Sequence, residues 1–212
     1  KYHVPRIIFI NKMDKLGANF EGTLAAIKDR LGSKPVVLAV PIGSEQQFRG
    51  IVLVLERKAL IWEGDLPTGK VGEAGGTYSE EEVPEDLKAM VEKYRSQTIE
   101  TISETDEQLL EKYVGGVEPD STELKTALRA ATIKTELFPT FCGSSLRNKG
   151  IQPLLDAVVE YLPSPIDLPP VKGVWDGQEE ERRVGDPGGI GPPTLPCHGS
   201  VLPVYHGPFL KL

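Results

Sequence analysis

The chain has 212 residues, a length that suits one or two domains with a buried core. Hydrophobic residues make up 39% and charged residues 26%, and no apolar run approaches the roughly 20 residues that a membrane span requires. This composition excludes fibrous chains and predicts a soluble protein that has no membrane partner. The two cysteines, Cys142 and Cys197, are too few for a disulfide framework, so we expect a reducing compartment.

The formal net charge of −7 is unevenly distributed along the chain. Residues 73–123 hold 15 acidic and 4 basic side chains, whereas the remaining residues hold 16 acidic and 20 basic ones. The acidity therefore belongs to one segment, and the mildly basic remainder is compatible with RNA or phosphate groups as partners.

The first predicted elements are a strand, a polar loop and a helix. Residues 6–10 form a β-branched and aromatic run typical of a buried parallel strand, and residues 11–19 form a polar loop. Apolar residues at helical spacing predict a helix over residues 20–31, with Gly32 at its C-cap. Because the chain starts almost directly with this strand, we expect it to be a fragment of a longer protein.

The middle of the chain predicts a small sheet followed by helices. Residues 36–40, 51–55 and 59–62 resemble strands of one small sheet, and residues 64–79 resemble an exposed loop. Helices are predicted over residues 84–113 and from 121 to about 133.

A second strand, loop and helix follow. Residues 138–142 predict a strand, 143–150 a loop, and 151–161 a helix whose apolar face carries Leu154, Leu155, Val158 and Leu162. From residue 173 onward, Gly and Pro make up 35% of the residues, which predicts an irregular tail. Two strands that each deliver a polar loop into a helix are typical of ligand sites in open α/β sheets.

The residue types of the first loop suit a guanine ring. The carboxylate of Asp14 can accept two parallel hydrogen bonds from ring and amino donors, and the amide of Asn11 can bond a ring edge or brace neighbouring loops. The aliphatic stem of Lys12 can cover an aromatic face. The alternative is a polar loop that merely caps the following helix.

The second loop contains Ser144, Ser145 and Leu146 after two small residues. Small side chains let backbone N–H groups approach a planar ligand, and such a donor can bond a carbonyl such as guanine O6. Taken alone, this loop is explained more simply as a serine-rich helix cap. Two such loops after two buried strands favour a shared site.

These segments resemble a known family. Asn11-Lys12-Met13-Asp14 resembles the fourth guanine-nucleotide motif of translational GTPases, and Ser144-Ser145-Leu146 resembles the fifth. The longer stretches over residues 9–15, 40–43 and 141–165 resemble elongation factor G, and the likeness covers about residues 4–172.

The resemblance implies an α/β fold that comprises the C-terminal half of a P-loop-type GTPase domain with an inserted α+β subdomain. Residues 1–33 and 121–172 would belong to the GTP-binding domain, residues 34–120 to the inserted subdomain, and residues 173–212 to an irregular tail that could be an aberrant start of a β-barrel domain. Asp14 would read the guanine donor edge, Asn11 the opposite edge, Lys12 would cover the ring, and the backbone of Ser145 would bond O6.

The resemblance also implies GTP or GDP as ligand and the ribosome, with its RNA and proteins, as partner of a monomer. The contexts of Lys15, Lys34 and residues 151–153 are closer to the mitochondrial ribosome-recycling branch than to the translocation branch, which favours the mitochondrial matrix over a bacterial cytoplasm.

Two departures from the family bear on activity. The 212 residues contain neither a Gly-x-x-x-x-Gly-Lys-Ser/Thr phosphate loop nor an Asp-x-x-Gly with a neighbouring catalytic histidine. We therefore expect Mg²⁺ binding only with the missing half of the domain, and no catalytic residue and no GTP hydrolysis in this chain alone. Its tail also lacks the alternating strands of the family's barrel.

The remaining candidate residues, which are the cysteines and a run of glutamates, are explained more simply by structural roles. Cys197 lies beside His198 in a Pro/Gly-rich segment, which does not suit a zinc site, and Cys142 is expected to be a small buried hydrophobe. Glu80-Glu81-Glu82 is expected to form a solvated face or to lie at a helix N-terminus. The competing function is a non-catalytic fragment whose acidic helices dock on a basic ribosomal protein.

Overall fold

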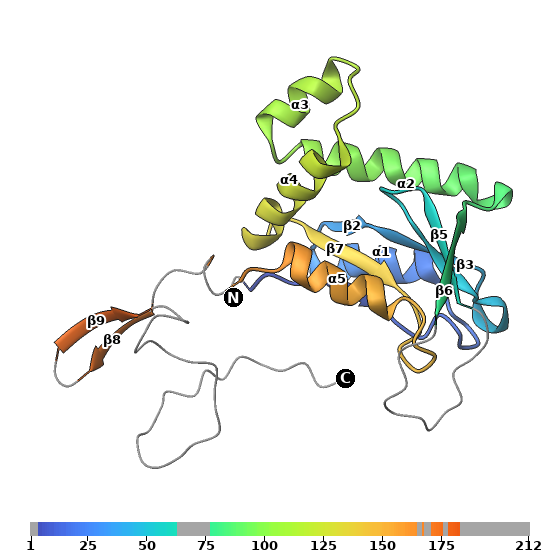
Figure 1. The fold of residues 1–212 in the computed structure, drawn as a ribbon, viewed down its shortest axis with the longest axis horizontal. Helices are drawn as coiled ribbons and strands as arrows, with labels where there is room; N and C mark the ends of the chain where they lie inside the picture. Colours follow the sequence, from blue (N-terminus) through green and yellow to red (C-terminus); the bar gives the residue numbers. More distant parts are fainter. Residues whose placement is uncertain (1–3, 63–76, 165–166, 168–170, 176–177, 183–212) are drawn as a thin grey trace, which may run out of the picture. The chain divides into compact units, whose positions relative to one another are not determined.

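A computed structural model of the chain describes residues 4–62, 77–164, 167, 171–175 and 178–182. Its contacts separate a compact unit, Lys1–Leu162, from a second unit, Pro163–Leu212. In chain order the first unit contains β1 (Ile8–Ile10), α1 (Phe20–Leu31), β2 (Pro35–Val37), β3 (Ala39–Ile42), the short 3-10 helix Glu45–Gln47, β4 (Gly50–Leu53), β5 (Lys58–Trp62), β6 (Tyr78–Glu82), α2 (Glu85–Ser103), α3 (Glu107–Val114), α4 (Ser121–Ile133), β7 (Phe138–Cys142) and α5 (Ile151–Tyr161) (Figure 1).

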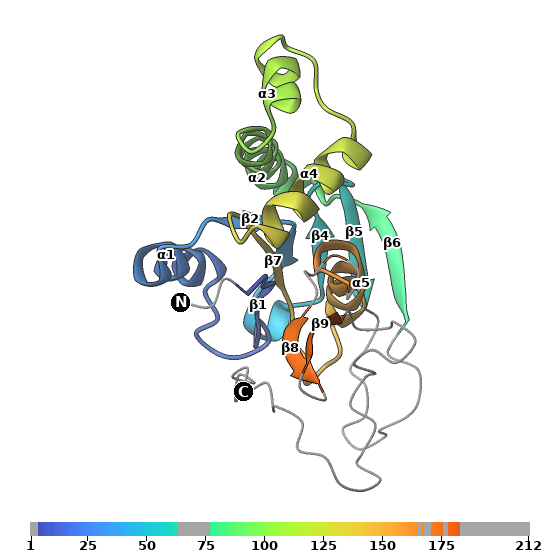
Figure 2. The ribbon, with the colours of Figure 1, turned by 90° about the vertical axis from the view of Figure 1, so that its left-hand side faces the viewer.

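A three-stranded parallel sheet of order β1-β7-β2 carries the two polar loops. Ile10 at the end of β1 is in register with Cys142 at the end of β7, so the loops that follow both strands leave from the same edge. Helices α1 and α5 lie on opposite sides of this sheet (Figures 1 and 2). The predicted α/β fold is confirmed.

The run over residues 36–40 divides between two sheets, which corrects the expectation of one small sheet. Val37 pairs with Thr140 in the parallel sheet, while Ala39 already pairs with Leu53 in an antiparallel sheet of order β3-β4-β5-β6. Leu38 joins the two sheets, because its N–H donates to the carbonyl of Thr140 at 2.9 Å and its own carbonyl accepts from Val54. The division into a GTP-binding domain and an inserted subdomain stays a prediction; the two parts lie in the first unit up to Leu162, and residues 163–172 fall in the second unit.

The single helix predicted over residues 84–113 is two helices. Helix α2 ends at Ser103, and the Asp106 side chain then caps α3 by accepting from the N–H groups of Gln108 and Leu109 at 3.0 and 3.1 Å. An aspartate that satisfies two free N–H groups starts a new helix even within a continuous apolar pattern. Helix α3 projects from the end of α2 (Figure 1).

Helix α5 buries a face that matches the expected one only in part, since Leu154 packs against the core while other expected residues do not. Pro153, Ala157 and Tyr161 are buried, whereas Leu155 and Val158 are exposed to 59% and 41%. The helix is apolar on more than one face, so its spacing cannot decide which face the sheet covers.

Two further expectations are corrected, one for residues 80–82 and one for the start of the predicted tail. Residues 80–82 lie on β6, an edge strand, and not at a helix N-terminus, although their solvated character is confirmed. Within the second unit, β8 (Val171–Trp175) and β9 (Gln178–Arg182) form an antiparallel hairpin, where an irregular tail was predicted from residue 173. The rest of the predicted tail, and residues 64–76 of the predicted exposed loop, lie outside the described residues.

Candidate functional site

The first loop (residues 11–19) and the second loop (residues 143–150) are joined through their backbones. Gly143 donates its N–H to the carbonyl of Ile10 at 3.0 Å, and Met13 donates its N–H to the carbonyl of Gly143 at 3.1 Å. These bonds continue the pairing of β1 and β7 beyond the strand ends. Two segments that lie far apart in the sequence are thus brought into one site.

The close approach of the loops requires glycine at position 143. A Cβ atom there would lie 2.3 Å from the carbonyl oxygen of Lys149 and 2.8 Å from the ring of Phe9. Any side chain would therefore distort the second loop itself and displace the Phe9 ring.

The amide of Asn11 braces the two loops from within the site. Its Oδ1 accepts from the backbone N–H groups of Lys12 at 2.7 Å and Ser145 at 3.0 Å, and its Nδ2 lies 2.8 Å from the hydroxyl of Ser145. The expected bracing role of Asn11 is therefore present. The Ser145 N–H, predicted to bond a ligand carbonyl, is already donated to Asn11.

The Asp14 side chain is only 2% exposed, yet its two oxygens are unequally satisfied. Oδ2 accepts from Arg147 Nε at 3.1 Å and lies 3.5 Å from the ammonium group of Lys15. Oδ1 has no hydrogen bond of good geometry among the described residues, although it is buried. A buried carboxylate oxygen without a well-formed hydrogen bond retains the capacity to accept from a ligand.

The surroundings of Asp14 keep it ionised. Burial by itself raises the pKa of this carboxyl group, but the neighbouring Ser144 hydroxyl, the backbone and the Arg147 guanidinium outweigh burial, and the pKa lies below its usual value of 3.8. Asp14 is therefore an acceptor on both oxygens at neutral pH.

The other predicted residues differ in exposure. Lys12 is exposed and adopts a left-handed backbone with a φ of 64°, which costs about 1–2 kcal/mol for a residue other than glycine. Ser144 is buried and pairs with Lys149 through both its backbone groups, while Leu146 is 64% exposed. The second loop thus presents Ser145 and Leu146 outward and anchors Ser144 inside.

Two residues that contact this site were not predicted from the sequence. The first is Arg147, which contacts Asp14. The second is Glu45, which lies in a turn of the antiparallel sheet and accepts a hydrogen bond of 2.8 Å from the N–H of Gly17. Arg147 directly follows Ser144-Ser145-Leu146, so proximity to that motif could have suggested it. No pattern in the sequence links Glu45 to Gly17.

A reactive cysteine, a metal site and a membrane-spanning helix are the other features that could bear on function in the described part of the chain. Cys142 is fully buried, and burial raises the pKa of its thiol, as expected for a packing residue. Among the residues that the structure describes, no group of His, Cys, Asp and Glu side chains could hold a metal ion. No helix in the described ranges is long and apolar enough to cross a bilayer.

Comparison with protein families finds that residues 1–164 match the model of the elongation factor Tu GTP binding domain. This match includes both loops and both sheets of the first unit. A translational GTPase, expected from the motifs, is confirmed at the level of the family.

Comparison with solved structures finds the crystal structure of the protein ttk003000868 from Thermus thermophilus. The two chains share 30% sequence identity with a TM-score of 0.66 over 79% of this chain. The match covers 24% of that chain, so the matched part of this chain corresponds to about a quarter of its length.

Proposed function

The chain belongs to the family of the elongation factor Tu GTP binding domain, and on this basis we propose that its first and second loops recognise the base of a guanine nucleotide. The observation that carries the proposal is the buried Asp14 carboxylate, whose Oδ1 has no well-formed hydrogen bond within the described residues. Guanine presents a ring N–H beside an exocyclic amino group, and this donor pair matches a carboxylate that is ionised and accepts on both oxygens.

The side chains around Asp14 set how a base would enter. Because the carboxylate is almost fully covered, a ring edge reaches it only when neighbouring side chains such as the half-exposed Lys15 shift. Long charged side chains that extend into solvent rearrange at low cost. Oδ2 has two lone pairs, so it can keep Arg147 and still accept from a base.

The second loop would supply the donor for guanine O6. Since the Ser145 N–H is donated to Asn11, the adjacent Leu146 N–H, for which no acceptor is found among the described residues, would take this role. The exposed Leu146 side chain and the stem of Lys12 can then cover the faces of the ring.

We further propose that the chain is part of an elongation factor G-type GTPase that acts on the ribosome. In such a protein, GTP hydrolysis and Mg²⁺ binding would depend on a phosphate loop that these 212 residues do not contain. The sequence contexts of Lys15 and Lys34 support the mitochondrial ribosome-recycling branch over translocation.

A nucleoside titration of the 212-residue chain tests base recognition without phosphate contacts. Guanosine and adenosine are added separately while backbone amide shifts are followed by ¹H–¹⁵N NMR. We expect guanosine to shift the amides of Ser145 and Leu146 in a saturable manner and adenosine to leave them unchanged. Equal responses to the two nucleosides would contradict guanine recognition.

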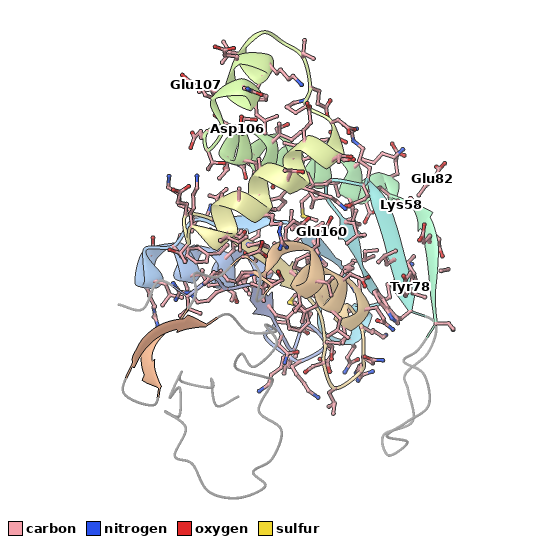
Figure 3. The ribbon with its side chains drawn as sticks, turned by 60° about the vertical axis from the view of Figure 1, so that its left-hand side comes forward. Lys58, Tyr78, Glu82, Asp106, Glu107 and Glu160 are labelled. Carbon is pink, nitrogen blue, oxygen red and sulfur yellow. The ribbon has the colours of Figure 1, made fainter. Side chains whose placement is uncertain are left out.

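One observation favours the competing function, a docking module with acidic helices. Helix α3 exposes Val114 to 78% and Leu110 to 40%, next to the acidic Asp106 and Glu107 at its start (Figure 3). An exposed apolar strip with acidic neighbours suits a basic, amphipathic protein surface. If guanosine fails to bind while a basic ribosomal protein shifts the α3 amides, this second function is the correct one.

A further inference from the structure

The turn between β3 and β4 (residues 43–49), here the β3–β4 turn, reaches the first loop from the antiparallel sheet. The Glu45 N–H donates to the carbonyl of Met13 at 2.8 Å, and the Glu45 carboxylate accepts from the N–H of Gly17 at 2.8 Å. One residue of the turn therefore holds the first loop at two points, one before and one after Asp14.

The same turn also contacts the second loop. The buried ammonium group of Lys149 lies 3.4 Å from the carbonyl oxygen of Phe48, and Lys149 pairs through its backbone with Ser144. Met13 of the first loop connects the other two segments, since its N–H donates to the carbonyl of Gly143 and its own carbonyl accepts from the N–H of Glu45. The site is thus closed by three segments, although the sequence motifs mark only two.

The backbone of the β3–β4 turn is shaped for this contact. Glu45 has a φ of 55°, a left-handed conformation that is unfavourable for a residue with a side chain. Gly43 makes the turn possible, because a Cβ atom there would lie 2.3 Å from the carbonyl oxygen of Gln47. Strain of this kind persists where the surrounding contacts determine the conformation. The two bonds of Glu45 to the first loop are such contacts.

We propose that the β3–β4 turn is a third part of the base-recognition site and that Glu45 is its positioning residue, holding residues 11–17 in the conformation that presents Asp14. The inference rests on the proposed guanine recognition. It adds that guanine affinity depends on the antiparallel sheet, whose turn need not touch the nucleotide.

Three variants of Glu45 in the 212-residue chain test this role. Glu45→Ala removes the acceptor for the Gly17 N–H, and Glu45→Gly removes it while relieving the positive φ. Glu45→Gln keeps an oxygen acceptor of the same shape. Gln46→Ala, at an exposed position of the same turn, is the matched control.

Two readouts are measured for every variant. The first is the hydrogen exchange rate of the Gly17 amide without any ligand, and the second is the dissociation constant for guanosine by NMR titration. We expect Glu45→Ala and Glu45→Gly to accelerate Gly17 exchange and to weaken guanosine binding about 3- to 10-fold, the usual effect of one hydrogen bond. Glu45→Gln and Gln46→Ala should stay within about twofold of the parent chain.

The outcomes separate this inference from the proposed function. Unchanged Gly17 exchange or unchanged guanosine affinity in Glu45→Ala and Glu45→Gly would overturn the positioning role. A loss shared by Glu45→Gln and Gln46→Ala would also overturn it, because it would reflect general damage to the turn. If the parent chain binds guanosine no better than adenosine, the proposed function itself fails, whatever the exchange rates are.

Discussion

At the scale of single residues, the site is defined by the hydrogen-bond partners of Asn11 and Asp14. Asn11 directs its amide to the second loop, and Arg147 and Lys15 occupy one oxygen of Asp14. The other oxygen of Asp14 is buried and has no well-formed hydrogen bond among the described residues. If the proposed base recognition is correct, selectivity depends mainly on this carboxylate, and its chemistry yields two predictions.

The substitution Asp14→Asn should change the preferred base. An amide turns one acceptor into a donor, which opposes the guanine amino group but matches xanthine, whose ring has a carbonyl in its place. An unpaired buried polar group costs on the order of 1–3 kcal/mol, so guanosine affinity should fall about 10- to 100-fold while xanthosine affinity rises. NMR titrations of both chains with both nucleosides measure this change.

Asp29→Asn is the matched control for this change of base. Asp29 lies exposed on α1, and its substitution removes the same charge. The preference of the Asp29→Asn variant for guanosine should therefore equal that of the parent chain. An unchanged preference in Asp14→Asn would mean that the first loop only caps a helix.

The Asp14 carboxyl group should titrate with a pKa below 3.8, and Arg147→Gln should raise this pKa. Since the pKa is depressed in the fold, ionised Asp14 contributes stability that is present above the unfolded-state pKa and is lost as pH falls through the folded-state value. The carboxyl carbon of Asp14, followed by ¹³C NMR against pH, reports the midpoint directly. Lys15→Gln is the comparison and should raise it less, because Lys15 is more distant and more exposed. A midpoint unaffected by Arg147→Gln would show that the two groups do not interact.

At the scale of elements, the site depends on two parallel strands that end together. β1 and β7 bring their loops to one edge, and α1 and α5 cover the two faces of the sheet (Figure 2). Helix α4 supports this arrangement by packing on α2, α5 and β7. The buried residues of α4 should therefore contribute more to the free energy of unfolding than exposed apolar residues at helix ends.

The paired substitutions Leu128→Ala and Leu31→Ala test this difference. Leu128 on α4 is fully buried, so truncation removes contacts and leaves a cavity, and we expect a loss of about 2–5 kcal/mol in the free energy of unfolding. Leu31 at the end of α1 is 71% exposed, and its loss should cost less than about 0.5 kcal/mol. Urea denaturation followed by circular dichroism gives both values. Similar losses for the two variants would contradict the packing described for α4.

At the scale of the whole molecule, base reading and phosphate chemistry are separate tasks. The first unit holds the two loops proposed to read the base, while the sequence contains no phosphate-loop motif. Phosphoryl transfer is accelerated mainly by positioning and by electrostatic stabilisation of the transferring group. Base recognition alone supplies neither of these.

We therefore expect the 212-residue chain to release no phosphate from GTP above the buffer rate. The assay measures inorganic phosphate with and without Mg²⁺ over a range of protein concentrations. Asp14→Asn, purified in the same way, controls for contaminating GTPases, whose activity would be equal in both preparations. Mg²⁺-dependent release that scales with protein concentration and is lost in Asp14→Asn would contradict the expectation.

The sequence by itself determined the local features of this protein. A β-branched and aromatic run predicted β1, a short apolar run predicted β7, and the spacing of apolar residues predicted α1. The residue types of Asn11 and Asp14 indicated a guanine ligand. Each of these features depends on neighbouring residues alone. The family motifs extended this to the α/β fold, which the comparisons confirm.

Only the tertiary structure decided how these local features are used. It divided the run over residues 36–40 between two sheets and chose the buried face of α5, since both depend on which distant surface is available to pack against. It likewise brought Glu45 to Gly17 and Arg147 to Asp14. Contacts between distant segments arise from the summed packing of the whole chain, so no local pattern encodes them.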